Sequence, residues 1–329
     1  MFLRRLLLRA STVDSGLPYN WNWQRRWNRM GGFLNQRPVV LMDVGARGEP
    51  PPELASLRPY LRRVGFEPDA DEYHRLKASG EGDVFPTVLA GSEGHQRLNL
   101  YRDRGYSSVL SLSERYQRLW SGTMPIDSTV ELPATTIDRF VAEHPDLAPD
   151  LLKLDTQGSE LSILQGASST LARVGLVEVE TEFFPLYEGQ PLFGDVARFL
   201  MDQGFELLYL NRVFFSRRQI YAGPSRGQVL FADALFGKRE DRLHDFTLEQ
   251  RAKYAILLCQ YGHLDIAWQM IRDCPPVGDI PGFSSIFGPR TSRPARALLM
   301  QLDKLLALAL HLRRDNQRNT DSDRSWPIR

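Results

Sequence analysis

From residue 38 to residue 237, short apolar runs alternate with stretches whose apolar residues recur at helical spacing. The run VVLMDV at residues 39–44 is almost continuously apolar, as expected for a strand that is covered on both faces. Further strands are predicted in VGFEP, VFPTVLAG, DLLKLDTQG and VGLVEVETEFF. Helices are predicted between them, in ELASLRPYLRR, DADEYHRLKASG, TTIDRFVAEH, SELSILQGASSTLAR and DVARFLMDQG.

Two more strands, FELLYLNRVFF and QVLFADALFG, end this region and are expected to be antiparallel. Strands that alternate with helices predict an α/β fold with a doubly wound sheet. In such sheets ligands bind beyond the carboxyl ends of the strands, so the candidate functional residues are expected there.

The chain outside this region has a different pattern. Residues 1–37 are interpreted as an N-terminal arm, and residues 238–329 as a helical C-terminal extension. The extension begins with a capping box, in which Thr247 is followed three positions later by Gln250. HLDIAWQMIRD is expected to pack back on this helix as a hairpin. Residues 294–314 predict an amphipathic helix that covers the main domain or a second subunit, so a homodimer is possible here, and the polar tail is predicted to be disordered.

Composition excludes several classes of protein. A net charge of +1 provides no field for a polyanion, so no nucleic-acid partner is expected. The two cysteines form no metal-binding pattern with histidine, and no metal is predicted. No run approaches the roughly 20 apolar residues of a membrane span, so we expect a soluble, cytoplasmic protein. The basic and apolar start, MFLRRLLLRA, leaves open a weak contact with a membrane surface.

Acids and glycines gather at the ends of the first two strands. Asp43 ends the first strand, Gly45 and Gly48 follow in the loop, and Glu67 ends the second strand. An acid at the second position suits the two hydroxyls of a ribose, and glycines let the backbone come close to a ligand. The alternative is an ordinary α/β turn with a fortuitous acid.

The loop favours a cationic nucleoside over a dinucleotide. A dinucleotide fingerprint reads G-x-G-x-x-G and opens directly into a helix whose N–H groups bind pyrophosphate. Here the loop reads G-x-x-G and continues with Glu49 and the prolines at 50–52, which have no N–H to donate. S-adenosylmethionine, with its ribose, ammonium and sulfonium groups, fits better than NAD. Asp43 would hold the ammonium directly or through water.

Several stretches give the chain a resemblance to a known family. They are LMDVGARG, VGFEPDADEYHRL, LPATTIDRF, DLLKLDTQGSELSILQGA, VEVETEFFPLYEGQPLF and FADALFG. Residues 38–237 thus resemble the FkbM-type methyltransferases, which are S-adenosylmethionine-dependent enzymes with a class I, Rossmann-like sheet. The resemblance implies that the cofactor is bound by Asp43, Gly45 and Glu67, with Pro68 beside the ribose and Leu89 and Ala90 near the adenine. The family usually has D-x-G-A-N-x-G in the first loop, whereas this chain has Arg47 and Gly48 there; Arg47 either binds the cofactor carboxylate or faces solvent.

The remaining strand ends provide candidates for catalysis. Asp155 ends the fourth strand, where it would orient the acceptor hydroxyl, fix the cofactor or cap the following helix. Glu178, Glu180 and Glu182 alternate along the fifth strand and so share one face. An alcohol accepts a methyl group well only if its proton is removed as the bond forms. Glu180 is the first candidate for this base and Asp155 the second, although either could instead bind substrate hydroxyls or pair with arginines.

The sequence thus predicts a methyltransferase that acts on a hydroxyl of a sugar or glycan-like acceptor. FFPLYEGQPLFGD, after the fifth strand, is a candidate acceptor-side loop, because aromatic rings with a few polar groups suit a sugar face. Two alternatives stay open. One is a methyltransferase with a nitrogen, protein or small-metabolite acceptor. The other is a non-catalytic, cofactor-binding scaffold that holds a partner through residues 238–329.

Overall fold

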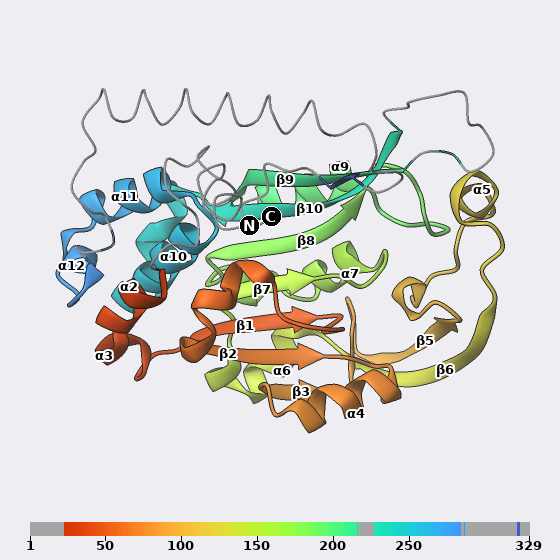
Figure 1. Ribbon diagram of the computed structural model, residues 1–329, viewed down its shortest axis with the longest axis horizontal. Coiled ribbons are helices and arrows are strands. Elements are labelled where there is room, and N and C mark those ends of the chain that lie inside the picture. Colours follow the sequence, from red (N-terminus) through yellow and green to blue (C-terminus); the bar gives the residue numbers. More distant parts are fainter. Residues whose placement is uncertain (1–22, 216, 218–226, 284–285, 287–320, 323–329) are drawn as a thin grey trace, which may run out of the picture.

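A mixed sheet forms the centre of the molecule (Figure 1). The computed structural model describes residues 23–215, 217, 227–283, 286 and 321–322. In these residues the sheet has eight strands in the order β11-β9-β10-β8-β7-β1-β2-β3. Their bounds are β1 Val39–Val44, β2 Leu61–Phe66, β3 Asp83–Phe85, β7 Leu151–Leu154, β8 Leu176–Glu182, β9 Phe205–Phe215, β10 Gln228–Lys238 and β11 Asp321–Ser322.

The strand order places a switch point between β1 and β7. β1 pairs in parallel with β2 on one side and with β7 on the other. The strands that follow β1 therefore extend the sheet first on one side of it and later on the other. β8 continues the parallel half, and β10 is antiparallel to both β8 and β9. The predicted doubly wound sheet and its two closing antiparallel strands are therefore confirmed.

Helices cover both faces of this sheet. One face carries α6 (Ile137–Glu143), α7 (Glu160–Gln165), α8 (Ser168–Leu171) and α9 (Phe193–Asp202), whose apolar side chains share a core with those of β1, β7 and β8. The other face carries α2 (Trp23–Arg29), α3 (Gly31–Leu34), α10 (Leu248–Gln260), α11 (Leu264–Asp273) and α12 (Pro275–Gly278). α4 (Ala70–Ser79) follows β2, and α5 (Glu114–Tyr116) lies further along the chain.

The helices that flank the predicted main domain are part of the core. Leu257 of α10 and Trp27 of α2 are fully buried in the same cluster as Leu41 and Leu176 of the sheet. The Trp27 indole also donates a hydrogen bond to Oε1 of Gln260 at 2.8 Å. α10 begins with the predicted capping box: the Gln250 N–H donates to Oγ1 of Thr247, and the Thr247 N–H donates to Oε1 of Gln250. The predicted hairpin is formed by α10 and α11.

Two predicted elements differ in the structure. The segment ELASLRPYLRR forms two 3-10 turns, Pro52–Ser56 and Arg58–Tyr60, before β2 begins at Leu61. Prolines at 52 and 59 lack the N–H that a longer helix needs. The predicted strand VFPTVLAG is split, because β3 ends just before Pro86 and β4 (Val88–Leu89) joins a different sheet.

That second sheet was not predicted. It has the order β4-β6-β5, with β5 at Gly94–Tyr101 and β6 at Ile126–Thr135. It lies beside the β2 and β3 end of the main sheet and is connected to it through residues 86–87 (Figure 1). The segment between β5 and β6 reaches the pocket described below.

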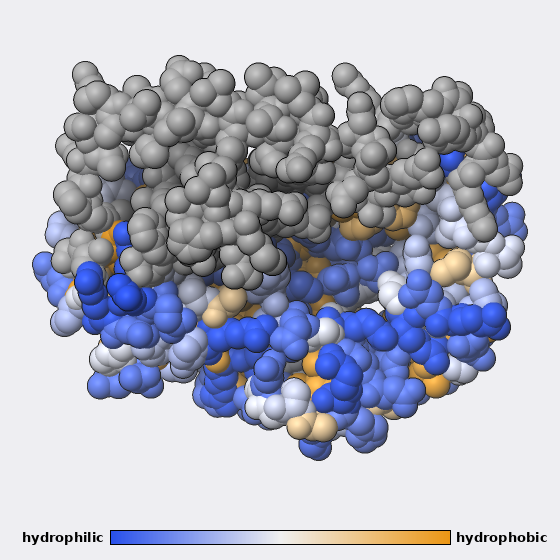
Figure 2. Space-filling view, in the orientation of Figure 1, coloured by the Kyte–Doolittle hydropathy of each residue, from blue (hydrophilic) through white to orange (hydrophobic). Residues whose placement is uncertain are grey.

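Several predictions concern residues outside the described part. The apolar start at residues 1–10, the helix at 294–314 and most of the polar tail belong to this group, and with them the membrane contact and the homodimer. Within the described residues, none of the helices is long and apolar enough to cross a membrane. Figure 2 shows one face of the molecule, on which the described residues are mainly hydrophilic and the hydrophobic ones lie in small patches.

Candidate active site

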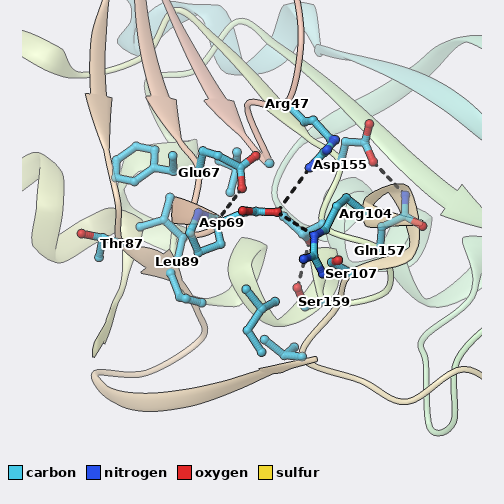
Figure 3. Close-up of a pocket in the computed structure, with 18 of the residues that line it drawn as sticks. Arg47, Glu67, Asp69, Thr87, Leu89, Arg104, Ser107, Asp155, Gln157 and Ser159 are labelled. Carbon is cyan, nitrogen blue, oxygen red and sulfur yellow. Dashed lines mark hydrogen bonds and ion pairs between the residues drawn. The ribbon is translucent and has the colours of Figure 1, made fainter. Parts of the chain in front are cut away.

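A pocket of about 240 Å³ lies at the carboxyl ends of β1, β2 and β7, next to the switch point (Figure 3). Five of the predicted site residues line it, and they are Gly45, Glu67, Pro68, Leu89 and Asp155. Four others are not in the lining: Asp43, Gly48, Ala90 and Glu180. The position is the one that a doubly wound sheet offers a ligand.

Gly45 allows the loop after β1 to pass directly against the loop after β7. Its backbone has φ +76°, and a Cβ atom added there would lie 2.0 Å from the carbonyl oxygen of Asp155. No side chain fits at that distance. Gly48 also has a positive φ, +78°, but it faces open space, and its N–H donates to Oε1 of Glu72 at 2.9 Å. Gly45 thus shapes the pocket, whereas Gly48 only closes the turn.

Asp43 holds the loop from behind instead of reaching the pocket. Its side chain is buried and pairs with Arg63 at 2.7 Å and with Lys153 at 3.4 Å. Arg63 in turn donates to the carbonyl oxygens of Ala46 and Gly48. The predicted contact of Asp43 with the cofactor ammonium is therefore not supported by its position, because a buried acid needs the partners that it already has.

Glu67 lines the pocket, and its carboxyl group has an oxygen to offer. Oε1 accepts the N–H of Asp69 at 2.9 Å, while Oε2 has no hydrogen-bond partner among the described residues. Burial raises the pKa of this carboxyl to about 7, and the neighbouring Asp69 adds to the rise. Pro68 and Leu89 also line the pocket, whereas Ala90 is buried and is not part of the lining.

Two arginines meet at an acid that sequence reasoning missed. Arg47 and Arg104 approach the same oxygen of Asp69, at 3.6 Å and 3.5 Å (Figure 3). Arg47 comes from the first loop and lines the pocket, so it is not a purely solvent-facing residue. Arg104 comes from the segment between β5 and β6, and no signal in the sequence could have placed it here without the second sheet.

Asp155 and Glu180 are joined by one side chain, Gln157. Its amide nitrogen donates to Oδ1 of Asp155 at 3.0 Å and to Oε1 of Glu180 at 2.7 Å. The other oxygen of Asp155 lies 3.7 Å from the Lys153 ammonium. Glu180 therefore lies one side chain behind the pocket lining, and its pKa is raised well above the ordinary value by burial first and by Asp155 second.

The helix that follows does not use Asp155 as its cap. α7 begins after Ser159, and the N–H groups of Thr156 and Gly158 are bound by the carboxylate of Glu160, at 2.7 Å and 2.9 Å. This leaves the Asp155 carboxyl facing the pocket. The capping alternative is thereby excluded.

The other two acids of β8 point to different surroundings. Glu178 accepts a hydrogen bond from the Tyr261 hydroxyl of the C-terminal helices, and burial raises its pKa to about 8. Glu182 is buried, and its Oε1 lacks a hydrogen-bond partner within the described residues. Only Glu180 is connected to the pocket through Gln157. Among the described residues, no group of three or more His, Cys, Asp or Glu side chains is placed to hold a metal ion.

Comparison with known proteins identifies the family. A domain described as "Methyltransferase FkbM domain" matches residues 43–207, which is half of the chain. The sheet order and the pocket at the switch point are those of a doubly wound α/β fold with a ligand site at the carboxyl ends of its strands. The chain belongs to the FkbM methyltransferase family. S-adenosylmethionine is accordingly its cofactor.

Solved structures give only distant matches. A methyltransferase FkbM from Methylobacillus flagellatus KT is 16% identical, with 60% of this chain and 43% of that chain covered and a TM-score of 0.35. Magnesium protoporphyrin IX methyltransferase from Synechocystis PCC 6803, with bound SAM, is 9% identical over 66% and 79% of the two chains, with a TM-score of 0.31. Likenesses this weak carry no argument about function. No curated protein matches the chain.

Proposed function

We propose that this protein transfers a methyl group from S-adenosylmethionine to a hydroxyl oxygen of a neutral sugar or glycan-like acceptor. The single observation that carries the proposal is the connection from the cofactor pocket through Gln157 to the Glu180 carboxyl. A hydroxyl needs a base at the moment of transfer, and a carboxylate whose pKa is raised above its ordinary value is a stronger base than an exposed one.

The residues around the pocket fit the cofactor. Glu67 would accept the ribose hydroxyls through Oε2, and Leu89 would contact the adenine. Arg47 and Arg104 both pair with Asp69, so two positive charges face one negative charge. The carboxylate of the cofactor would pair with the arginines as the second negative charge. Bound there, the cofactor supplies an activated methyl group on a sulfonium sulfur.

The hydrogen bonds favour Glu180 over Asp155 as the base. Both oxygens of Asp155 already face donors, one on Gln157 and one on Lys153. Oε1 of Glu180 is bound by Gln157, and its Oε2 has no hydrogen-bond partner in the described part of the chain. We therefore assign proton removal to Glu180 and orientation of the acceptor to Asp155. An oriented acceptor would gain most of its rate from alignment with the methyl group.

Charge favours a neutral acceptor over an anionic one. The carboxyl groups that act on Glu180 are those of Asp155, Glu160, Glu182 and Asp233. A phosphorylated or carboxylated acceptor would be repelled from this side of the pocket. The same acids would also attract an amine, so N-methylation is the second candidate.

Methyl transfer from isotope-labelled S-adenosylmethionine to a panel of matched acceptors tests the proposal. The panel pairs a neutral sugar with its phosphate and with its amino analogue, and products are identified by mass spectrometry. We expect label on an oxygen of the neutral sugar, and a loss of at least 100-fold in turnover for Glu180→Gln with unchanged cofactor affinity. Glu131→Gln, an exposed acid on β6, is the matched control.

Three outcomes would contradict the proposal. Label found only on the amino analogue would replace oxygen by nitrogen as the methylated atom. Full turnover in Glu180→Gln would remove Glu180 as the base. Cofactor binding without transfer to any acceptor would favour the scaffold alternative.

A further inference from the structure

Gln157 has an unusual backbone conformation. Among the described residues it is the only one other than glycine with a positive φ, +59°. Such a conformation costs about 1–3 kcal/mol in a residue with a side chain, and it persists only when the surroundings hold it. Gln157 also lines the cofactor pocket and follows β7 at the switch point.

Three separate segments hold this residue in place. Its backbone carbonyl accepts the hydroxyl of Ser108, from the segment between β5 and β6, at 2.7 Å. Its side-chain oxygen lies 3.0 Å from the hydroxyl of Tyr187, from the segment after β8, and that hydroxyl is shared with the carbonyl oxygen of Tyr106 at 3.1 Å. Its side-chain nitrogen faces Asp155 and Glu180. The strained backbone therefore serves to aim one amide at two carboxyl groups.

The orientation of this amide is determined by its neighbours. When they are ionised, the two carboxyl groups accept hydrogen bonds and cannot donate them. The NH₂ end of the amide must therefore face them, and its oxygen must face the Tyr187 hydroxyl. Each of the two N–H bonds then serves one carboxyl oxygen: Oδ1 of Asp155 and Oε1 of Glu180. A proton on Oε1 of Glu180 would oppose the N–H that points at it.

We propose that Gln157 is a positioning residue that directs the acceptor proton to Oε2 of Glu180. This inference rests on the proposed function of the same site. As the acceptor oxygen forms its bond to the methyl carbon, the carbon–sulfur bond breaks and its electron pair stays on sulfur, which becomes a neutral thioether. The acceptor proton moves to Oε2, and the bond from Gln157 to Oε1 is kept throughout.

The charged surroundings of Glu180 set the direction of the expected effect. The titratable groups that act on it or lie against it are Asp155 after β7, Glu160 of α7, Glu182 of β8, Asp233 of β10, Tyr187 of the following segment and, beyond Asp155, Lys153. The four carboxyl groups among them oppose a negative charge on Glu180. A donor on Oε1 stabilises the ionised form, so its removal must raise the pKa of Glu180 further.

Infrared titration of the carboxyl groups measures this directly. The full chain is saturated with S-adenosylhomocysteine, the thioether product, and the Glu180 band is assigned by its absence in Glu180→Gln. We expect Gln157→Met to move the Glu180 midpoint upward by about one to two pH units, the equivalent of one hydrogen bond to a charged group. Gln165→Met, the same change at an exposed position of α7, should leave the midpoint unchanged.

A second variant covers the case in which Gln157→Met does not fold. Tyr187→Phe removes the hydroxyl that the Gln157 oxygen shares with the Tyr106 carbonyl, and it should move the midpoint in the same direction by less. An unmoved midpoint in the variants that fold would overturn the proposal, even if they were less stable. The titration needs no acceptor, so its failure is distinct from a failure to methylate sugars.

Discussion

At the scale of single residues, folding and cofactor binding favour different protonation states of Glu67. Burial raises its pKa to about 7 from an ordinary value of 4.5. Between these values the folded protein keeps a proton that the unfolded chain has lost, so the stability that this group contributes falls as the pH rises. Above pH 7 the carboxylate is ionised, and the hydroxyl donors of a bound ribose would offset part of the cost of burying that charge.

Glu67→Gln should therefore stabilise the empty protein and weaken cofactor binding. Relative to wild type, we expect its free energy of unfolding to increase from pH 5 to pH 8 by up to about 3 kcal/mol. We expect its affinity for S-adenosylmethionine at pH 8 to fall about tenfold or more. Denaturant unfolding and calorimetry measure the two effects. Equal affinity would refute the ribose role, and the exposed Glu81→Gln is the matched control.

The two loop glycines should respond differently to the same substitution. Gly45→Ala places a Cβ against the Asp155 carbonyl and must displace one of the two loops, so cofactor binding should be lost. Gly48→Ala faces open space and should cost only the roughly 1–2 kcal/mol of a left-handed backbone, with binding retained. Binding titrations of both variants test this. Wild-type affinity in Gly45→Ala would contradict the close approach of the loops.

At the scale of elements, periodicity was enough to predict the main sheet. The apolar runs of β1, β7 and β8 are buried on both faces, and such runs are distinctive in sequence. β5 and β6 were missed because most of their residues are exposed or half-buried, so their apolar residues do not alternate clearly. With the second sheet missing, Arg104 could not be placed in the pocket.

The register of β2 explains why the partner of Asp43 was not predicted. Arg63 lies in β2 and pairs with Leu41 of β1, two positions before Asp43. The sequence favoured a helix over ELASLRPYLRR, which includes Arg63. The predicted strand began only after Arg63, so this arginine was not placed beside Asp43. The ends of strongly apolar strands were enough to predict Gly45, Glu67 and Asp155 as site residues. The structure brings these three together at the pocket.

α10 should behave as part of the main core and not as a separate module. Truncation after Gly237 removes its buried side chains from the cluster that contains Leu41 and Leu176, so we expect no cooperatively folded protein. A milder test is Leu257→Ala, which should cost about 2–5 kcal/mol of unfolding free energy, against less than about 0.5 for the exposed Leu248→Ala. A soluble, fully stable truncation would show an independent extension.

At the scale of the whole molecule, three layers position one pocket. The helices of both faces fix the sheet, the switch point opens the space between the loops after β1 and β7, and the second sheet contributes Arg104 from outside. The arginines meet Asp69 on the β2 side of the pocket, and the acids of the β7 and β8 side lie around Glu180.

Calorimetric titration of the full chain with S-adenosylmethionine, and separately with NAD, tests the central claim most directly. We expect binding of S-adenosylmethionine in the micromolar range or tighter, which is about −8 kcal/mol or better, and no binding of NAD. The affinity should weaken as the pH is lowered through 7, because Glu67 then takes up a proton. Binding of NAD alone, or no binding of S-adenosylmethionine at pH 8, would contradict the account.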